Sequence, residues 1–179
     1  MTNMTFSRVD AVRTNMRRAH IQTPDLQLVT AHLADVDSVV VLFGALHRYN
    51  ASLDPHFALA DDWESLLRHE FQETVCHPDH LWVLIRDGER AVGLLIAAVH
   101  MDSPMFRHRC WVEVEALYVD DNYRGKHVAQ RLLNKAYSWA ESKRIRRVQL
   151  YVTASNVRAQ AVYTNQGFTV TQAIMRKSL

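Results

Sequence analysis

The pattern of apolar and polar positions along the chain predicts strands and helices in alternation. Residues 25–31 alternate with the period of two that is typical of a strand. From Asp35 the apolar positions recur at steps of three and four residues, which predicts a helix that ends near Pro55. Residues 61–73 keep this spacing behind an acidic first turn and predict a second helix.

Three strands in series are predicted next. Residues 80–100 hold two apolar runs on either side of Asp87-Gly88, a dipeptide that favours a β-hairpin. Residues 109–120 alternate over their whole length and predict a long third strand. A helix is expected to start after Gly125, and its buried side is expected to consist of Val128, Leu132, Leu133, Ala136 and Ala140.

The rest of the chain predicts a strand, a short helix and a final strand. Residues 146–153 have strand alternation, and residues 156–166 predict a helix that ends before Gly167. Residues 168–177 predict a strand or hairpin. The strand–helix–strand crossover over residues 110–152 requires its two strands to be parallel. The predicted fold class is therefore α/β (α+β), with a mixed sheet and helices on both faces.

Composition is ordinary for a globular protein and narrows the classes of function. The chain has 179 residues, of which 48% are hydrophobic and 22% charged, so we expect residues 24–179 to form a single domain. The net charge of +2 is too small to predict nucleic-acid binding. No apolar run reaches the roughly 18 residues of a membrane span. Residues 1–23 are polar and are interpreted as an N-terminal extension, because Asp10 disfavours a transit peptide.

Cysteine and histidine spacing argues against disulfides and metal sites. Cys76 and Cys110 form no CxxC pair, and the N-terminus has no secretory signal, so we expect reduced thiols in a cytoplasmic protein. His77 and His80 flank Pro78 without a second pair of ligands at zinc-site spacing. We therefore predict no metal.

Positive charge is concentrated where the helix after Gly125 begins, in the stretch YRGKHVAQRLL (residues 123–133). A helix N-terminus has unpaired N–H groups and a partial positive charge, and both attract an anion. Arg124 and Lys126 add positive side chains, and Gly125 lets a ligand approach the backbone. Neither the GxxxxGK[ST] nor the GxGxxG phosphate motif is present. The stretch predicts either another kind of anion site or an ordinary cationic first turn.

Two motifs resemble the GNAT superfamily of N-acetyltransferases. LYVDDNYRGKHVAQRLL (residues 117–133) resembles its acetyl-CoA-binding motif, Arg/Gln-x-x-Gly-x-Gly/Ala after a strand that ends in Leu-Tyr-Val. Arg124 and Ala129 match, whereas His127 stands at the place of the central glycine and would either crowd the pyrophosphate or donate a hydrogen bond to it. SNVRAQAVYTNQGF (residues 155–168) resembles the segment Asn-x-x-Ala-x-x-x-Tyr-x-x-x-Gly-Phe at full spacing.

This resemblance implies a fold and a binding site for acetyl-CoA. The implied sheet is mostly antiparallel, with about six to seven strands, about four helices and a splayed parallel strand pair. The pantetheine arm would enter between residues 117–119 and 151–153, where backbone groups of Leu117 and Val119 would hold it. Asn156 would contact the same arm. The pyrophosphate would bind the backbone N–H groups of Arg124, Gly125, Lys126, His127, Val128 and Ala129.

The resemblance also implies direct acetyl transfer to a primary amine. Most of such an amine is protonated at neutral pH, so a base is expected, and Glu115 or Glu113 would supply it beside the thioester. Two solvent-facing glutamates are the alternative interpretation. Tyr163 stands at the family's general-acid position and would protonate the departing thiolate, with a core tyrosine as the alternative.

The sequence does not identify the acceptor. In such folds the first two helices and their loop line its site, which here is residues 45–57 with His47, Tyr49, Asp54 and His56. The amine can belong to a small molecule, a peptide or a protein, and the sequence is compatible with a homodimer. A competing hypothesis is a non-catalytic acyl-CoA-binding module that senses its ligand or binds a partner without turnover.

Overall fold

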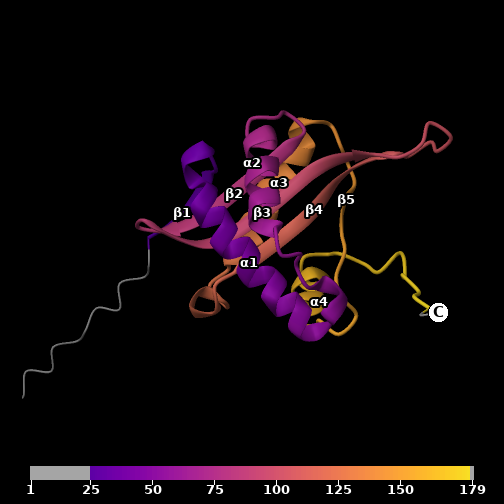
Figure 1. The fold of residues 1–179 in the computed structure, drawn as a ribbon. Coiled ribbons are helices and arrows are strands. Elements are labelled where there is room, and N and C mark those ends of the chain that lie inside the picture. Colours follow the sequence, from indigo (N-terminus) through magenta and orange to yellow (C-terminus); the bar gives the residue numbers. More distant parts are fainter. Residues whose placement is uncertain (1–24, 178–179) are drawn as a thin grey trace, which may run out of the picture.

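The computed structural model describes residues 25–177, and its centre is a five-stranded sheet (Figure 1). The strands lie side by side in chain order. The first three pairings are antiparallel, and the last is parallel, as the crossover predicted. Residues 1–23, the expected extension, lie outside the described residues. The strand bounds are β1 Leu26–Thr30, β2 His80–Asp87, β3 Arg90–Met101, β4 Cys110–Val119 and β5 Val148–Leu150.

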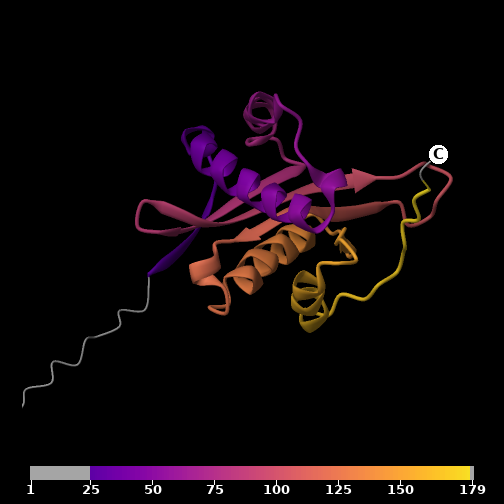
Figure 2. The same ribbon diagram turned by 60° about the horizontal axis from the view of Figure 1, so that its bottom comes forward.

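The α-helices cover the two faces of the sheet (Figure 2). One core cluster lies under α1 and α2, where the rings of Phe71 and Trp82 meet edge to face with centroids 5.0 Å apart. The other cluster lies under α3, whose buried residues are the five that the sequence predicted. α4 joins this second cluster through Tyr163. The helix bounds are α1 Val36–Leu53, α2 Trp63–Thr74, α3 Val128–Ser142 and α4 Val157–Asn165.

The sheet is smaller than predicted, with five strands in residues 25–177 rather than six to seven. Residues 168–177, predicted as a strand or hairpin, contain no strand, and Val170 and Met175 are 90% and 94% exposed. Of the predicted strand 146–153, only Val148–Leu150 pairs with β4. The reason is the same in both cases: an alternating segment becomes a strand only where a neighbouring strand exchanges hydrogen bonds with it.

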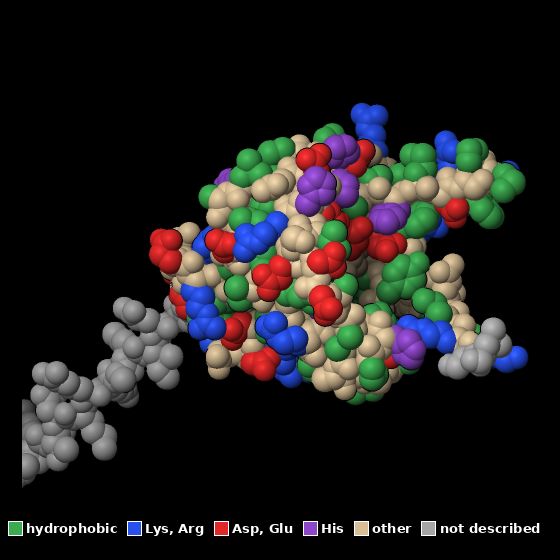
Figure 3. Space-filling view, viewed as in Figure 1, with side chains coloured by type: hydrophobic (Ala, Val, Ile, Leu, Met, Phe, Trp, Pro, Cys, Tyr) green, Lys and Arg blue, Asp and Glu red, His purple; other side chains and the backbone are tan. Residues whose placement is uncertain are grey.

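A hollow opens on the face that carries α1 and α2 (Figure 3). It lies between the projecting β3–β4 hairpin and the C-terminal segment, and acidic and histidine side chains gather along its edge. The hairpin leads into the first residue of β4, whereas β4 continues beyond the last residue of β5 at its opposite end, from Glu115 to Val119. The two strands therefore separate at the end of the sheet away from this hairpin.

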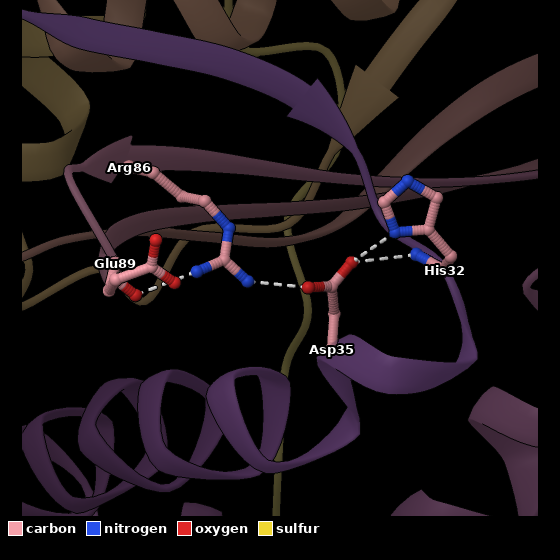
Figure 4. Close-up of polar contacts among 4 residues, drawn as sticks. All are labelled: His32, Asp35, Arg86 and Glu89. Carbon is pink, nitrogen blue, oxygen red and sulfur yellow. Dashed lines mark hydrogen bonds and ion pairs between the residues drawn. The ribbon is translucent and has the colours of Figure 1, made fainter.

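The start of α1, by contrast, is fastened to the β2–β3 hairpin by a buried carboxylate (Figure 4). Asp35 is only 6% exposed. It accepts a hydrogen bond of 2.8 Å from the His32 backbone, contacts His32 Nδ1 at 2.7 Å, and pairs with Arg86, which also donates to the carbonyl of Glu89. Burial alone would raise the pKa of Asp35, but the hydrogen bonds from His32 and Arg86 outweigh burial and hold the pKa below its usual range.

Candidate active site

A β-bulge interrupts β4 in the middle of the strand. Ile96 of β3 pairs with Ala116, but the next residue, Ala97, pairs with Val114, so Glu115 is an extra residue on β4. The parallel pairing with β5 ends at Val114, immediately before this residue. Because a bulge bends the strand that carries it, β4 turns away from β5 at this point. The splayed parallel pair that the family resemblance implies is present, and the bulge marks where it begins.

Beyond the bulge, backbone groups of β4 face a gap instead of a strand. The N–H of Asp120 donates to the carbonyl of Val92 at 2.9 Å, which sets the hydrogen-bonding register with β3. Because hydrogen-bonded and non-hydrogen-bonded pairs alternate in an antiparallel ladder, Tyr118 bonds to β3, whereas Leu117 and Val119 direct their N–H and C=O groups to the other edge. These are the two residues that the sequence resemblance assigned to the pantetheine arm.

The first turn of α3 offers backbone N–H groups and few competing acceptors. Gly125 and His127 both have left-handed backbone, with φ of 77° and 59°. His127 is the residue before the helix and contributes no capping hydrogen bond, and the first turn has no acidic side chain. The His127 ring lies beside the side chain of Gln130, with His127 Nδ1 and Gln130 Oε1 3.2 Å apart. An added Cβ on Gly125 would meet nothing within 4 Å, so the backbone there is open to a ligand.

The left-handed conformation of His127 explains why glycine is usual at this place in the family motif. Glycine reaches positive φ without the steric penalty of a Cβ atom, whereas histidine tolerates it at a cost. The exposed ring contacts Gln130, one turn along the helix. Of the two outcomes expected for His127, this geometry does not favour crowding of the anion site.

The two cations of the motif have different surroundings. Arg124 donates from Nε to the carbonyl of Val119 at 3.1 Å, pairs with Asp121 and lies 5.8 Å from the ring centre of Tyr49. Lys126 is exposed, with Nζ 4.9 Å from the ring centre of Tyr123. Arg124 thus fastens the loop to β4 and α1, and Lys126 keeps its charge at the surface.

The next two residues of the motif are apolar. Val128 is buried and Ala129 half-buried, so these residues offer mainly their backbone N–H groups.

The start of α4 and its last turn hold the other two expected residues. Asn156 is buried and caps α4, because its Oδ1 accepts from the N–H of Ala159 at 3.1 Å. Its side-chain NH₂ group is left for another partner. Tyr163 is half-buried and its ring lies 5.7 Å from that of Phe168. Burial, and to a lesser degree Tyr137, raises the pKa of Tyr163 to about 12, so its hydroxyl keeps its proton at neutral pH.

The two glutamates of β4 have different partners. Glu113 accepts from Nε1 of Trp111 at 3.1 Å and from Nε2 of Gln149 at 3.2 Å. Glu115 lies with Oε1 3.1 Å from Nε2 of His100, and the His100 ring stacks on Trp111 with centroids 5.8 Å apart. Neither glutamate is simply solvated, because each is held by neighbouring side chains. Of the two, Glu115 is the one at the bulge.

Sequence reasoning missed the partners of these glutamates. His100 comes from β3, Gln149 from β5 and Glu70 from α2. Partial burial and then the charge of Glu115 raise the pKa of Glu70, which places a third carboxyl group in the neighbourhood. Their positions depend on strand register and helix packing, and no local signal in the sequence identifies them.

The expected acceptor segment, residues 45–57, spans the end of α1 and a short 3₁₀ turn, Pro55–Phe57. Burial lowers the pKa of His47. Asp54 accepts from the N–H of His56 at 3.0 Å and from Arg176 at 2.8 Å. Its carboxylate therefore already has a cationic partner within the chain. Tyr49 is engaged with Arg124.

Residues 25–177 contain no group of three or more His, Cys, Asp or Glu side chains arranged to hold a metal ion. No helix among them combines the length and the apolar character that crossing a bilayer requires.

A model of the acetyltransferase (GNAT) family matches residues 46–168, which include both motifs. The chain belongs to this family. The resemblance to GNAT N-acetyltransferases that the motifs indicated is thereby confirmed.

Two relatives support this membership over part of their length. Mycothiol acetyltransferase from Beutenbergia cavernae is 32% identical over 103 residues, which are 58% of this chain and 33% of that protein. The uncharacterized N-acetyltransferase YycN from Bacillus subtilis is 32% identical over 100 residues, 56% of this chain and 62% of that protein. This GNAT chain therefore spans less than two thirds of either relative.

The fold is also that of solved acetyltransferases. Aminoglycoside N-acetyltransferase AAC(6')-Iy in complex with CoA superposes with a TM-score of 0.68 and 15% identity, covering 86% of this chain and 94% of that chain. At this identity the likeness concerns the fold.

Proposed function

We propose that this GNAT protein transfers the acetyl group of acetyl-CoA directly to a primary amine. The observation that carries the proposal is the gap in the sheet after Glu115, where the backbone of Leu117 and Val119 faces open space. An N–H group fixed in a sheet and directed at a thioester oxygen stabilises the negative charge that develops there during attack. The fold supplies this group without any movement of a loop.

The residues around the gap fit acetyl-CoA along its length. The pantetheine arm lies beside Leu117 and Val119, and the side-chain NH₂ of Asn156 is left to bind it. The pyrophosphate lies against the N–H groups at the start of α3, next to the open backbone of Gly125 and the exposed Lys126. Arg124 contributes indirectly, because its contacts with Val119 and Tyr49 hold the loop in place.

The reaction needs a base and an acid on opposite sides of the thioester. Glu115, held by His100, takes a proton from the amine directly or through water, which frees the nitrogen lone pair. The new C–N bond forms, the C–S bond breaks, and the thiolate receives the hydroxyl proton of Tyr163. Burial keeps that proton on Tyr163 until the thiolate departs.

Direct transfer is favoured over a covalent enzyme intermediate by the places of the two cysteines. Cys110 stands at the first position of β4, seven residues before Leu117, which corresponds to roughly 20 Å along a strand. Cys76 follows α2 and is exposed. Neither thiol adjoins the gap, so neither can accept the acetyl group from a thioester bound there.

The acceptor side of the gap favours an amine with a second positive charge. Glu113 and Glu115 lie on this side, and Glu70 of α2 is close enough for Glu115 to affect its pKa. Figure 3 shows acidic and histidine side chains along the edge of the hollow. We therefore expect spermidine to be acetylated faster than n-butylamine, which has a single amine.

Calorimetry with acetyl-CoA followed by an assay of CoA release tests the proposal. We expect binding, and CoA release when spermidine, an aminoglycoside or a lysine-containing peptide is added, with the acetylated amine identified by mass spectrometry. Absence of binding at millimolar acetyl-CoA would contradict the proposal. Binding without CoA release from any amine would identify a non-catalytic acyl-CoA-binding module instead.

A further inference from the structure

The C-terminal end of α1 spans the gap between β4 and β5. The ring centre of Tyr49 lies 5.8 Å from the guanidinium of Arg124, in the loop that follows β4. One helical turn later, the carbonyl oxygen of Leu53 lies 3.5 Å from the hydroxyl of Ser155, in the segment that follows β5. Asp54 comes directly after Leu53, so its carboxylate lies at the acceptor side of the gap.

A cation of the chain itself occupies this carboxylate. Nη1 of Arg176 lies 2.8 Å from Oδ2 of Asp54, and the Arg176 guanidinium lies 5.5 Å from the ring centre of Phe57. The other oxygen, Oδ1, accepts a hydrogen bond of 3.0 Å from the N–H of His56, which fixes the orientation of the carboxylate. A carboxylate and an aromatic face both attract a guanidinium or ammonium ion. Asp54 and Phe57 therefore form a cation subsite.

Little else holds Arg176 in the cation subsite. Residues 169–177 form no strand, and no backbone hydrogen bond joins them to another part of residues 25–177. Val170 and Met175 are almost fully exposed, so packing does not anchor the segment, which borders the hollow in Figure 3. The Arg176 side chain is 51% exposed, and an exposed ion pair contributes little net stability. A cationic ligand can therefore displace Arg176 without breaking a strand or opening the core.

We propose that the cation subsite binds a second positive charge of the acceptor and that Arg176 occupies it until the acceptor arrives. Because the group found there is a guanidinium, the favoured acceptor carries a primary amine at one end and a guanidinium group at the other. That guanidinium replaces the one of Arg176 on Asp54, and the amine remains free for acetylation. The inference rests on the proposed function for the transfer, whereas binding at the subsite can be measured without it.

Agmatine, which is n-butylamine with a terminal guanidinium group, tests the subsite against n-butylamine itself. Calorimetry of each amine with the CoA-bound protein measures Kd without turnover. Arg176→Ala removes the internal competitor, so we expect the Kd for agmatine to fall about threefold and the Kd for n-butylamine to change less than about twofold. Asp54→Asn keeps the shape of the side chain and removes its charge, so we expect the Kd for agmatine to rise about fivefold.

Lys177→Ala is the matched control, because it removes the next positive charge of the same exposed segment and leaves Arg176 in place. It should keep both Kd values within about twofold of wild type. A purely structural ion pair predicts that Arg176→Ala and Asp54→Asn change the Kd for agmatine in the same direction. That result, or an unchanged Kd for agmatine in Arg176→Ala, would overturn the inference.

An assay of CoA release separates the inference from the proposed function. With acetyl-CoA present, Arg176→Ala should lower the KM for agmatine by a factor similar to the change in Kd. A wild-type protein that shows the opposite Kd shifts in the two variants but releases no CoA from any amine would contradict the proposed function and leave the cation subsite standing. CoA release without those Kd shifts would contradict the cation subsite alone.

Discussion

The two edges of β4 differ in how much of the strand they pair. Toward β3, nine positions of the strand are paired, from Cys110 to Val119 with Glu115 left out. Toward β5, only Val112, Glu113 and Val114 are paired. Open strand edges invite unwanted pairing, and proteins usually cover or shorten them. Here the open edge coincides with a bulge and with the family's binding motif, which supports the proposed binding of acetyl-CoA there.

The N-termini of α1 and α3 differ in a similar way, because one is satisfied by the protein and the other is open. At the start of α1, Asp35 brings negative charge to the helix N-terminus and is itself held by Arg86 and His32. At the start of α3, the first turn has no acidic residue, and Lys126 and Arg124 lie just before it. One N-terminus is neutralised by the protein, and the other is left to attract an anion from outside. The closed region supports the fold, and the open region is available for chemistry.

The contrast predicts that Tyr163→Phe impairs catalysis and not folding. The ring and its contact with Phe168 are kept, and only the proton that would reach the thiolate is lost. We expect kcat to fall roughly 10²–10⁴-fold while the Kd for acetyl-CoA and the melting temperature stay nearly unchanged. Steady-state kinetics and calorimetry measure the two quantities. Full turnover would make this tyrosine a core residue.

Deletion of Glu115 should make β4 pair with β5 over a length closer to its pairing with β3. Without the extra residue, Val114 and Ala116 would follow one another opposite Ala97 and Ile96, and β4 would run straight. We expect β4–β5 pairing to lengthen across the gap and the affinity for acetyl-CoA to fall about 100-fold, as for the loss of two backbone hydrogen bonds.

Glu115→Gln is the matched control for this deletion, because it keeps the bulge and loses only the charge. Its affinity for acetyl-CoA should stay within about threefold of wild type, since the base is not expected to hold the cofactor. Equal affinities in the deletion and the control would show that the bulge does not create the gap.

Asp35→Ala should damage the closed region alone. Removing one partner of a buried ion pair leaves Arg86 unpaired, so we expect a loss of about 3 kcal/mol in the free energy of unfolding, measured by urea denaturation. The Kd for acetyl-CoA should not change at a temperature where the variant is folded. A variant as stable as wild type would show that the pair contributes nothing net.

The same carboxylate predicts a pH dependence with a definite sign. The pKa of Asp35 is lowered by folding, so its contribution to stability is present above its unfolded pKa and is lost as the pH falls through its folded pKa. Wild type should therefore lose more stability than Asp35→Ala on acidification. Parallel stability curves for the two proteins in acid would contradict this.

The smallest effect is expected from His127→Gly. Glycine adopts the left-handed backbone of this position without strain, so the free energy of unfolding should rise by about 0.5–1 kcal/mol. The affinity for acetyl-CoA should stay within about threefold, because the ring contacts Gln130 and leaves the backbone N–H groups open. His127→Ala, which keeps the Cβ, should not be stabilised. A large loss of affinity in His127→Gly would show that the ring itself binds the anion.

Features that depend only on residues close together in the chain could be predicted before the fold was known. The five buried positions of α3 follow from helical spacing, and Gly167 ends α4 because glycine accepts its φ of 87°. The Asp87-Gly88 turn was likewise predicted and found. The two family motifs are of the same kind, since caps, turns and anion-binding N–H groups lie within a few residues of one another. Predicting these features requires no knowledge of which helices and strands pack against one another.

Features that depend on strand pairing could be recognised only in the folded protein. Residues 168–177 have strand alternation but no strand beside them, and the predicted strand 146–153 pairs only until β4 bends away. The bulge at Glu115 becomes visible only when β4 is aligned with β3, and His100 meets Glu115 only in that register. Pairing is a property of two segments far apart in the chain, so the physical information that specifies it is not contained in either segment alone.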